Sequence, residues 1–436
     1  MQSANPRDTK LKVLIIAEAA NPEWTSVPLI GWSLSFAIAQ EFDAHLVTQI
    51  RNKEAIERTG WTEGNEFTAI DSELFSAPLY KMATSIRRGK QLAWTVATAA
   101  GSVSYPYFEY LCWRQFKTRL AAGEFDLVHR VTPVSPTAPS YLAKKLKKLG
   151  VPFIVGPING GVAWPKQYMD RMKKEGEWLS KIRWLYKVLP GYRSLRRDAS
   201  ALISGSYATQ SELPNSTRGK QFYIPENAID TQRFPYDGRK TFHKPLRAIF
   251  IGRLVPYKGV DIAIDAMIDF LKSGELTFEI YGDGPEKAQI EQQIRDNNVH
   301  DSVNLVGFID HKSLQESIQN AHILVFPSIR EFGGGVILEA MALGIVPIVA
   351  DYAGPGELVK GRYGYKVPLD DRAGLVAGFR ETIATILQEP DILIEKSKAA
   401  RAEVEAKFTW PKKVEQLEQV YRWVLDGGEK PTLFDP

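Results

Sequence analysis

The stretch His322-Ile-Leu-Val-Phe-Pro-Ser-Ile-Arg-Glu331-Phe-Gly-Gly-Gly-Val-Ile-Leu-Glu339 contains an apolar run followed by a glycine triplet. The run up to Ser328 predicts a buried strand that leads into a loop, and residues 336–343 predict a helix. The glycines therefore lie at a strand-to-helix turn, where backbone N–H groups lack intrahelical partners and the helix dipole is positive. Because glycine lets a ligand approach the backbone closely, this turn predicts a binding site.

Two carboxylates border this turn and are separated by seven residues. Glu331 lies at the end of the predicted strand and faces the same space as the glycines. Glu339 lies inside the predicted helix, where a carboxylate can accept hydrogen bonds from a diol. Both side chains are therefore candidate binding groups.

The composition is that of an ordinary globular protein, with 436 residues, 44% hydrophobic and 24% charged. A net charge of +4 is too small to indicate nucleic-acid binding by itself. Cys112 is the only cysteine, which excludes an intrachain disulfide and a thiolate metal cage. This cysteine usage fits a reducing compartment, and we expect a cytoplasmic location.

No targeting segment stands out in the sequence. Residues 11–17 are apolar but short, and Glu18 follows directly, so they predict a first buried strand rather than a signal sequence. Residues 91–108 carry no charge over a length at which a membrane span must be considered. Their threonines, serines, glycine and proline make them too polar for that reading.

The order of predicted elements indicates an α/β protein with two doubly wound domains. In the first half, strand 13–17 leads through a long loop to a helix at Trp32–Phe42 and a second strand at 44–48. The polar stretch 236–245 breaks the alternation, and we expect the domain boundary there. The alternation then restarts with predicted strands at 247–251, 277–281, 303–307 and 345–350.

Three features of the first half are candidates for ligand contact, because they follow strands at the edge where such folds bind ligands. Trp24 and Gly31 lie in the loop after the first strand, although Trp24 and Pro28 could equally only shape a surface turn. His129 ends the predicted strand 125–129. A lone histidine is usually structural, but its position at this sheet edge favours a functional role. Asn159 lies in a turn-rich loop, Gly156 to Gly161, that could approach a ligand closely.

Residues 166–198 form an unusually basic segment, with ten Lys or Arg minus four Asp or Glu giving a local balance of +6. Trp178, Leu179, Ile182, Leu185, Tyr186 and Leu189 recur within it at helical spacing. A basic amphipathic helix of this kind suits an anionic membrane surface. The alternative is a helix that packs on its domain and leaves a solvated basic face.

A second loop with chemical character follows the strand 247–251. It contains Gly252, Arg253, Lys258 and Gly259, and a helix is predicted from Val260. Two cations and free N–H groups are thus placed at a strand's carboxyl end, before a helix N-terminus, where a phosphate would bind.

Several short motifs together resemble the retaining glycosyltransferases of family 4, densely over residues 222–360 and sparsely before them. These motifs are Gly252-Arg253 with Lys258-Gly259, Gly282-Asp283-Gly284-Pro285, Pro327-Ser328, Glu331 with Glu339, Ile224 to Asp230 followed by Phe234, and Asp126 to His129.

This resemblance implies the GT-B fold, in which two Rossmann-like domains face each other across a cleft. We expect an acceptor-binding domain at 1–237, a nucleotide-sugar-binding domain at 238–409, and a terminal helix at 410–436 that crosses back to the first domain. The implied activity is retaining transfer of a hexose-type sugar from a nucleotide-sugar donor to a glycan or lipid-linked acceptor. No metal, cofactor or nucleic acid is expected to take part, and peripheral contact with the inner face of the membrane is a further expectation.

The resemblance also implies roles for individual residues. Arg253 and Lys258 would neutralise the leaving diphosphate, and Glu339 would bind the nucleotide ribose. Glu331 and the N–H groups of the glycine triplet would hold donor-sugar hydroxyls, and His129 would contact that sugar from the other domain. The expected catalytic residues are His129, Arg253, Lys258 and Glu331. The expected donor-binding residues are Asn227, Gly252, Gly282, Phe308, Phe332, Gly333, Gly334, Gly335 and Glu339. The expected acceptor-binding residues are Trp24, Gly31 and Asn159.

Two departures from the family pattern concern substrate identity. The family's usual Gly-Phe-Gly after the first glutamate is Phe332-Gly333-Gly334-Gly335 here, and the usual glycine pair after the first strand is absent. Donor and acceptor specificity are therefore not transferred from the family. A nucleotide-sugar epimerase, a glycoside phosphorylase or a non-catalytic sugar-nucleotide-binding protein on the same fold stay as alternatives.

Overall fold

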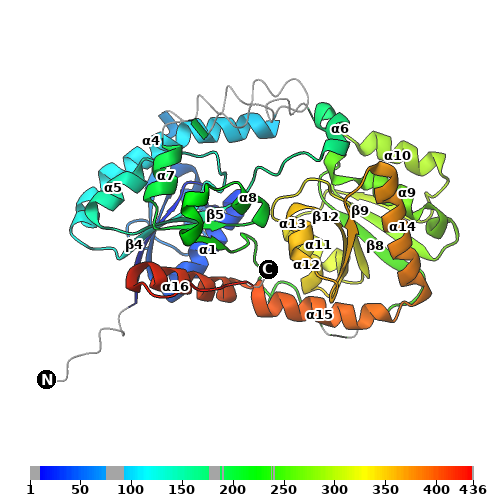
Figure 1. Cartoon of the computed structure of the whole chain (residues 1–436). Helices are drawn as coiled ribbons and strands as arrows, with labels where there is room; N and C mark the ends of the chain where they lie inside the picture. Colours follow the sequence, from blue (N-terminus) through cyan, green and yellow to red (C-terminus); the bar gives the residue numbers. More distant parts are fainter. Residues whose placement is uncertain are drawn as a thin grey trace. The chain divides into compact units, whose positions relative to one another are not determined.

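The computed structural model describes residues 10–74, 93–175, 187–188, 191–236, 238 and 241–434. These residues form two compact units (Figure 1). Unit 1 contains the described parts of 1–161, 177–226 and 413–436, and unit 2 contains those of 162–176 and 227–412. The chain therefore passes from one unit to the other more than once.

Unit 1 is built around a parallel sheet, whose described strands number seven in the order β3-β2-β1-β4-β5-β6-β7. The central strands β1, β4, β5 and β6 are buried on both faces apart from the first residue of β1, as expected for a parallel sheet covered by helices. Their bounds are β1 (Lys12–Ala17), β2 (Asp43–Gln49), β3 (Phe67–Ile70), β4 (Leu127–Thr132), β5 (Phe153–Ile158), β6 (Ala201–Ser204) and β7 (Gln221–Tyr223).

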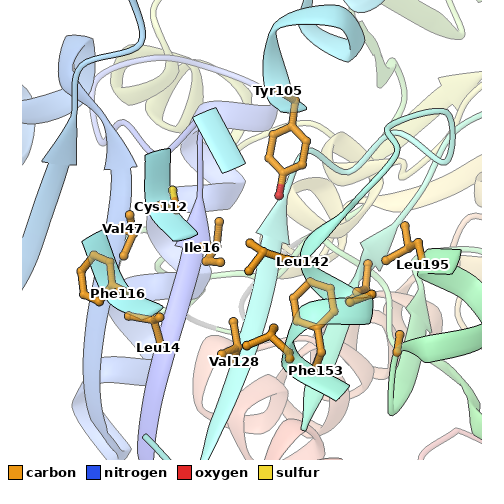
Figure 2. Close-up of a cluster of buried hydrophobic side chains, with 14 of the residues drawn as sticks. Leu14, Ile16, Val47, Tyr105, Cys112, Phe116, Val128, Leu142, Phe153 and Leu195 are labelled. Atoms are coloured by element: carbon orange, nitrogen blue, oxygen red, sulfur yellow. The ribbon is translucent and has the colours of Figure 1, made fainter. Parts of the chain in front are cut away.

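Helices cover both faces of this sheet. They are α1 (Val27–Glu41), α2 (Lys53–Glu57), α4 (Ala93–Ala121), α5 (Leu142–Leu149), α7 (Tyr192–Asp198), α8 (Tyr207–Ser211) and most of α16 (Trp410–Asp426), with 3-10 turns η1 (Ile50–Asn52) and η4 (Asn215–Lys220). One core cluster lies between the sheet and helices α4, α5 and α7. In Figure 2, Phe116 and Cys112 of α4 extend toward strand residues such as Leu14 and Val47.

Helix α1 corrects one sequence prediction. It begins at Val27, whereas the sequence predicted a loop up to Gly31 and a helix from Trp32. Pro28 lies in the first turn of the helix, where a missing N–H costs nothing because that group has no intrahelical partner. Pro28 therefore starts the helix instead of shaping a loop.

Unit 2 holds a second parallel sheet, in which six described strands follow the order β10-β9-β8-β11-β12-β13. The strands are β8 (Leu246–Ile251), β9 (Leu276–Tyr281), β10 (Val303–Gly307), β11 (Ile323–Phe326), β12 (Val346–Asp351) and β13 (Tyr365–Pro368). The helices are α6 (Met169–Lys174), α9 (Val260–Lys272), α10 (Lys287–Asp296), α11 (His311–Ile318), α12 (Gly335–Ala342), α13 (Ala353–Leu358), α14 (Arg372–Gln388) and α15 (Ile392–Lys407), with 3-10 turns η2 (Lys166–Tyr168) and η5 (Pro256–Lys258). In Figure 1, α9 and α14 lie on one side of the sheet, and α11 and α12 lie on the other.

The strand order identifies where each sheet binds ligands. Each sheet winds outward in both directions, from β1 and β4 in unit 1 and from β8 and β11 in unit 2. Open α/β sheets bind ligands outside the carboxyl ends of the strands at this switch point. The predicted pair of Rossmann-like units with parallel sheets is confirmed, and in unit 2 the edge carries the loops singled out in the sequence.

Helix α4 covers the described part of the uncharged stretch 91–108 and continues to Ala121. Across the described parts of the chain, no helix combines the length and the apolar character that a membrane span requires.

The basic segment 166–198 is described only in part. It contributes α6 and α7, and the six apolar residues that suggested an amphipathic helix lie outside the described residues. Two of its arginines do not form a solvated face, because Arg171 and Arg196 are buried. Arg196 Nη2 donates to the Pro136 carbonyl at 2.8 Å. Lys173 and Lys174 are exposed at the end of α6.

Candidate functional site

The loops at the carboxyl edge of the unit 2 sheet are joined by backbone hydrogen bonds. Gly252 N–H donates to the Tyr281 carbonyl at 2.9 Å, and Gly282 N–H donates to the Gly307 carbonyl at 2.8 Å. Gly252 and Gly282 have φ values of 154° and 148°, and a Cβ on Gly282 would overlap the carbonyl oxygen of Gly252. Only glycine fits this conformation and contact, so both glycines keep the ends of β8 and β9 close together.

An ion pair lies at the switch point itself. Lys258 Nζ, at the end of η5, contacts the Glu331 carboxylate after β11, and both side chains are largely buried. The two loops are also joined through Tyr257, whose carbonyl accepts the Ile329 N–H at 2.9 Å. Gly259 (φ 74°) begins α9, and a Cβ there would lie 2.6 Å from the Pro327 carbonyl oxygen. The sequence prediction therefore correctly brought Lys258 and Glu331 to one place.

Arg253 supplies a second cation at this edge. Its side chain is exposed, and no described residue forms a hydrogen bond or ion pair with it. Burial raises the pKa of Tyr257 to about 12, the Glu331 charge adds to that rise, and the Arg253 charge opposes it. Arg253 and Glu331 thus lie within electrostatic range of the same tyrosine, with Arg253 available to an anionic ligand.

The glycine triplet forms the start of α12. Gly334 is its N-cap residue with φ 56°, a left-handed conformation that suits glycine. Asn227 Nδ2 donates to the Gly333 carbonyl at 3.0 Å, and a Cβ on Gly335 would lie 3.1 Å from Asn227 Oδ1. Asn227 therefore holds the turn, and the first N–H groups of α12 give this edge a positive potential.

The remaining predicted donor-binding residues lie in the same unit. Glu339 on α12 is half-buried and has an interaction partner within the chain. Phe332 is also half-buried. Phe308, directly after β10, is 78% exposed. An exposed aromatic ring at this edge is suited to stacking on a flat ligand.

His129 is placed differently from the prediction. Its side chain is 0% exposed inside β4, with Nδ1 2.6 Å from the Tyr421 hydroxyl and Nε2 2.8 Å from the Gly156 carbonyl. Burial lowers its pKa to about 4, so the ring is neutral. Both ring nitrogens are used by unit 1 itself, which fits the structural role that is usual for a lone histidine. Contact between His129 and a donor sugar stays a prediction.

Asn159 is also occupied by its own unit. It is 5% exposed, its amide N–H groups donate to both Glu226 carboxylate oxygens at 2.7 and 2.8 Å, and its Oδ1 accepts from Ser206 at 2.9 Å and Thr209 at 3.0 Å. Glu226 is the buried partner of Asn159, and the sequence indicated it only as part of the motif Ile224 to Asp230. This network uses both the N–H groups and the oxygen of the amide, and contact between Asn159 and an acceptor stays a prediction.

Gly31 and Trp24 lie near the carboxyl edge of the unit 1 sheet. Gly31 is buried in α1, and a Cβ there would overlap the Ala19 carbonyl oxygen, so its small size serves packing of α1 on the loop after β1. Trp24 is 46% exposed in that loop. Contact between these residues and an acceptor stays a prediction.

Arg330 is a residue of this edge that the sequence did not single out, although it precedes Glu331. Its Nε donates to the Val162 carbonyl at 3.2 Å, and its guanidinium lies 5.0 Å from the Trp164 ring centre and 5.4 Å from that of Phe332. Residues 162–164 come from a part of the sequence that the family resemblance did not cover.

Comparison with known proteins identifies the part of unit 2 that carries this site. Residues 237–404 match the family model described as glycosyl transferases group 1. These residues are a glycosyl transferases group 1 domain. The predicted membership in family 4 is confirmed over this domain, which contains every predicted donor-binding residue except Asn227.

Curated relatives match just over half of the chain. The chain is 29% identical over 241 residues to a glycogen synthase of Mycobacterium tuberculosis, covering 54% of this chain and 57% of the relative. It is 29% identical over 248 residues to a putative colanic acid biosynthesis glycosyltransferase, WcaL, of Salmonella typhimurium, covering 55% and 58%. The chain thus spans just over half the length of these relatives.

Solved structures resemble nearly the whole chain, including both units. HepE of Anabaena, solved with UDP and glucose, superposes with a TM-score of 0.60 at 17% identity, covering 94% of this chain and 98% of HepE. Sucrose-phosphate synthase of Thermosynechococcus elongatus gives a TM-score of 0.58 at 18% identity, covering 96% and 100%. At this identity the likeness shows the fold, which is the expected GT-B class.

Proposed function

We propose that this protein is a retaining glycosyltransferase that transfers a hexose-type sugar from a nucleotide-sugar donor to a glycan or lipid-linked acceptor. The observation that carries the proposal is the Lys258–Glu331 pair at the switch point of the group 1 domain, between Arg253 and the glycine-rich start of α12. Cations, a carboxylate and helix N–H groups meet there, which are the groups that bind a diphosphate and sugar hydroxyls.

Each group has a role in the proposed reaction. Lys258 is paired with Glu331, so an incoming diphosphate would take over part of the Lys258 charge and leave Glu331 to accept sugar hydroxyls. Arg253 would bind the outer phosphate oxygens. Glu339 would bind the ribose, and Phe308 would stack on the base.

In the proposed mechanism the acceptor hydroxyl attacks the anomeric carbon from the face that the diphosphate leaves. The bond between the anomeric carbon and the phosphate oxygen breaks, the new glycosidic bond forms on the same face, and the leaving phosphate takes the acceptor proton. Arg253 and Lys258 stabilise the negative charge that develops on the diphosphate, which is the largest contribution expected of the protein. No protein nucleophile and no metal ion are assigned a role.

The proposal is tested with a panel of nucleotide sugars that begins with UDP-sugars, because the structurally similar HepE was solved with UDP and glucose. We expect Lys258→Ala and Glu331→Ala each to lower kcat/KM by about 100-fold or more. Lys360→Ala, an exposed lysine of the same domain, is the matched control and should leave the rate unchanged. Unchanged transfer and donor hydrolysis in both site variants would reject the assignment.

Product analysis by mass spectrometry separates the alternatives. A changed sugar that forms without any acceptor would identify an epimerase. Tight donor binding with no turnover over a broad acceptor panel would identify a binding protein.

We further propose that the basic segment 166–198 brings the enzyme to the cytoplasmic, anionic face of a membrane. Exposed Lys173 and Lys174 support this, since each basic residue near such a surface contributes about 1 kcal/mol. In a flotation assay, the protein should rise with vesicles that contain phosphatidylserine. The double variant Lys173→Gln/Lys174→Gln should show a smaller vesicle-bound fraction. Equal flotation of the double variant would remove the basis for this proposal.

A further inference from the structure

We infer that residues 162–175, which we call the strap, position the two donor loops of unit 2. In the sequence, unit 1 residues flank the strap on both sides, yet it belongs to unit 2. The strap lies outside the matched range 237–404, so the family match assigns it no role. The inference rests on the proposed function only in naming these loops as donor loops.

The first anchor of the strap is Arg171 on α6, which is 7% exposed. Its Nη2 and Nη1 donate to the two carboxylate oxygens of Asp261 at 2.6 and 3.1 Å, and Nη1 also donates to the Pro256 carbonyl. Asp261 lies in the first turn of α9, and Pro256 begins η5, the turn that ends in Lys258. One planar guanidinium therefore fixes the start of α9 relative to the loop that carries Lys258.

Asp261 also accepts hydrogen bonds from Arg372 of α14, whose Nε and Nη2 donate to Oδ2 at 3.2 and 3.1 Å. Removing Arg171 would therefore leave this carboxylate with Arg372, which is about half exposed. The Pro256 carbonyl would lose the Arg171 donor. The expected result is a looser η5 and not a wholly unpaired buried charge.

The second anchor lies at the start of the strap. The Trp164 ring meets the Tyr257 ring edge-on with centres 6.1 Å apart and lies under the Arg330 guanidinium. The Val162 carbonyl accepts from Arg330, and the Ala163 carbonyl accepts from the Tyr352 hydroxyl at 2.9 Å. Tyr257 precedes Lys258, and Arg330 precedes Glu331, so this anchor holds the neighbours of both site residues.

The two anchors together explain how the Lys258–Glu331 pair keeps its geometry. The strap contacts Pro256 and Tyr257 in the loop of Lys258 and Arg330 in the loop of Glu331. Trp164 and Arg171 are therefore positioning residues that act through the loops. A small displacement of charged groups at such a site lowers the rate by orders of magnitude. The same displacement moves the groups that hold the donor, so loss of an anchor should also weaken donor binding.

Hydrogen exchange of the free protein tests the inference without relying on activity. In Arg171→Ala, peptides that cover 250–260 and 327–336 should exchange faster, whereas those of β12 should not change. Arg171→Lys keeps a charge without the fork and should give an intermediate rate. Asp170→Ala, on the same helix but exposed, is the matched control. Unchanged exchange of both loops in Arg171→Ala would overturn the inference.

UDP titration provides the second readout, at a temperature where circular dichroism shows each variant folded. Arg171→Ala should weaken UDP binding by about tenfold, and Arg171→Lys should recover part of it. If the wild-type protein binds UDP and Arg171→Ala binds it equally well, the strap has no positioning role. If the wild-type protein neither binds UDP nor accepts any donor of the panel, the proposed function fails, and the exchange experiment still decides the role of the strap.

Discussion

His129 shows how burial sets the behaviour of a single residue in this protein. Its ring connects β4 to α16 through the Tyr421 hydroxyl and reaches β5 through the Gly156 carbonyl. Burial disfavours the charged ring and lowers its pKa from the ordinary 6.5 to about 4. The folded protein therefore holds a neutral histidine under conditions in which an exposed one would be protonated.

This shift predicts a pH-dependent loss of stability. Because the folded pKa lies below the unfolded one, the unfolded chain takes up the proton first, and stability falls as the pH drops from 6.5 to about 4. The loss attributable to His129 is roughly 2 to 3 kcal/mol over that range. Urea unfolding at pH 7 and pH 4.5 measures it, and His129→Gln should show a smaller difference between the two.

The control for this prediction is His300→Gln, which replaces an exposed histidine of unit 2. It should keep the pH dependence of the wild-type protein. The same pH dependence in His129→Gln and in the wild-type protein would contradict the prediction.

At the scale of single elements, α1 is fixed by the absence of one side chain. Alanine in place of glycine inside a helix ordinarily adds about 1 kcal/mol of stability. In Gly31→Ala the new Cβ would overlap the Ala19 backbone carbonyl and approach Thr132 Cγ2 at 3.0 Å. We expect a destabilisation of about 1 to 3 kcal/mol, measured as a lower Tm.

Gly219→Ala is the matched control, since a Cβ on that residue meets nothing within 4 Å. It should leave the Tm unchanged or raise it. A Tm for Gly31→Ala at or above that of the wild-type protein would show that α1 can shift away from the loop.

Much of the element order follows from the sequence. Strands 247–251 and 303–307 were predicted to within one residue. The first is a largely buried strand of the sheet interior, which appears in the sequence as a continuous apolar run. The meeting of Lys258 and Glu331 followed from the rule for switch points. The start of α1 was predicted wrongly because a proline in a first helical turn looks the same in the sequence as a proline in a loop.

Side-chain environments were less accessible to prediction. The burial of His129 depends on Tyr421, which lies 292 residues away in the chain. Arg171 was indistinguishable from the solvated lysines around it, because only the folded chain shows that it pairs with Asp261. Glu226 was visible only as part of a motif, and its bonds to Asn159 come from tertiary structure.

At the scale of the whole molecule, the last helix belongs to the first unit. Leu417, Val420 and Tyr421 of α16 are buried, and the Tyr421 ring centre lies 5.4 Å from that of Phe42. Leu417→Ala should therefore lower the stability of unit 1 by about 2 to 5 kcal/mol while unit 2 is unaffected. Hydrogen exchange resolves the units: β1 and β4 should lose protection, and β8 and β11 should keep it.

Gln419→Ala, on the exposed side of α16, serves as the control and should change neither unit. Equal loss of protection in both sheets would mean that the units unfold together, and the prediction of separate stabilities would then be wrong.

Because the strap belongs to unit 2, it affects how this unit can be exchanged between related proteins. If residues 237–404 were replaced by those of a relative, positions 257, 261 and 330 would come from the relative. Their contact partners Trp164 and Arg171 would still come from this protein. In such a hybrid, Trp164 and Arg171 of the strap would face loop residues that did not evolve with them. Chimeric enzymes with altered sugar preference are therefore better assembled by exchanging residues 162–176 together with 227–412.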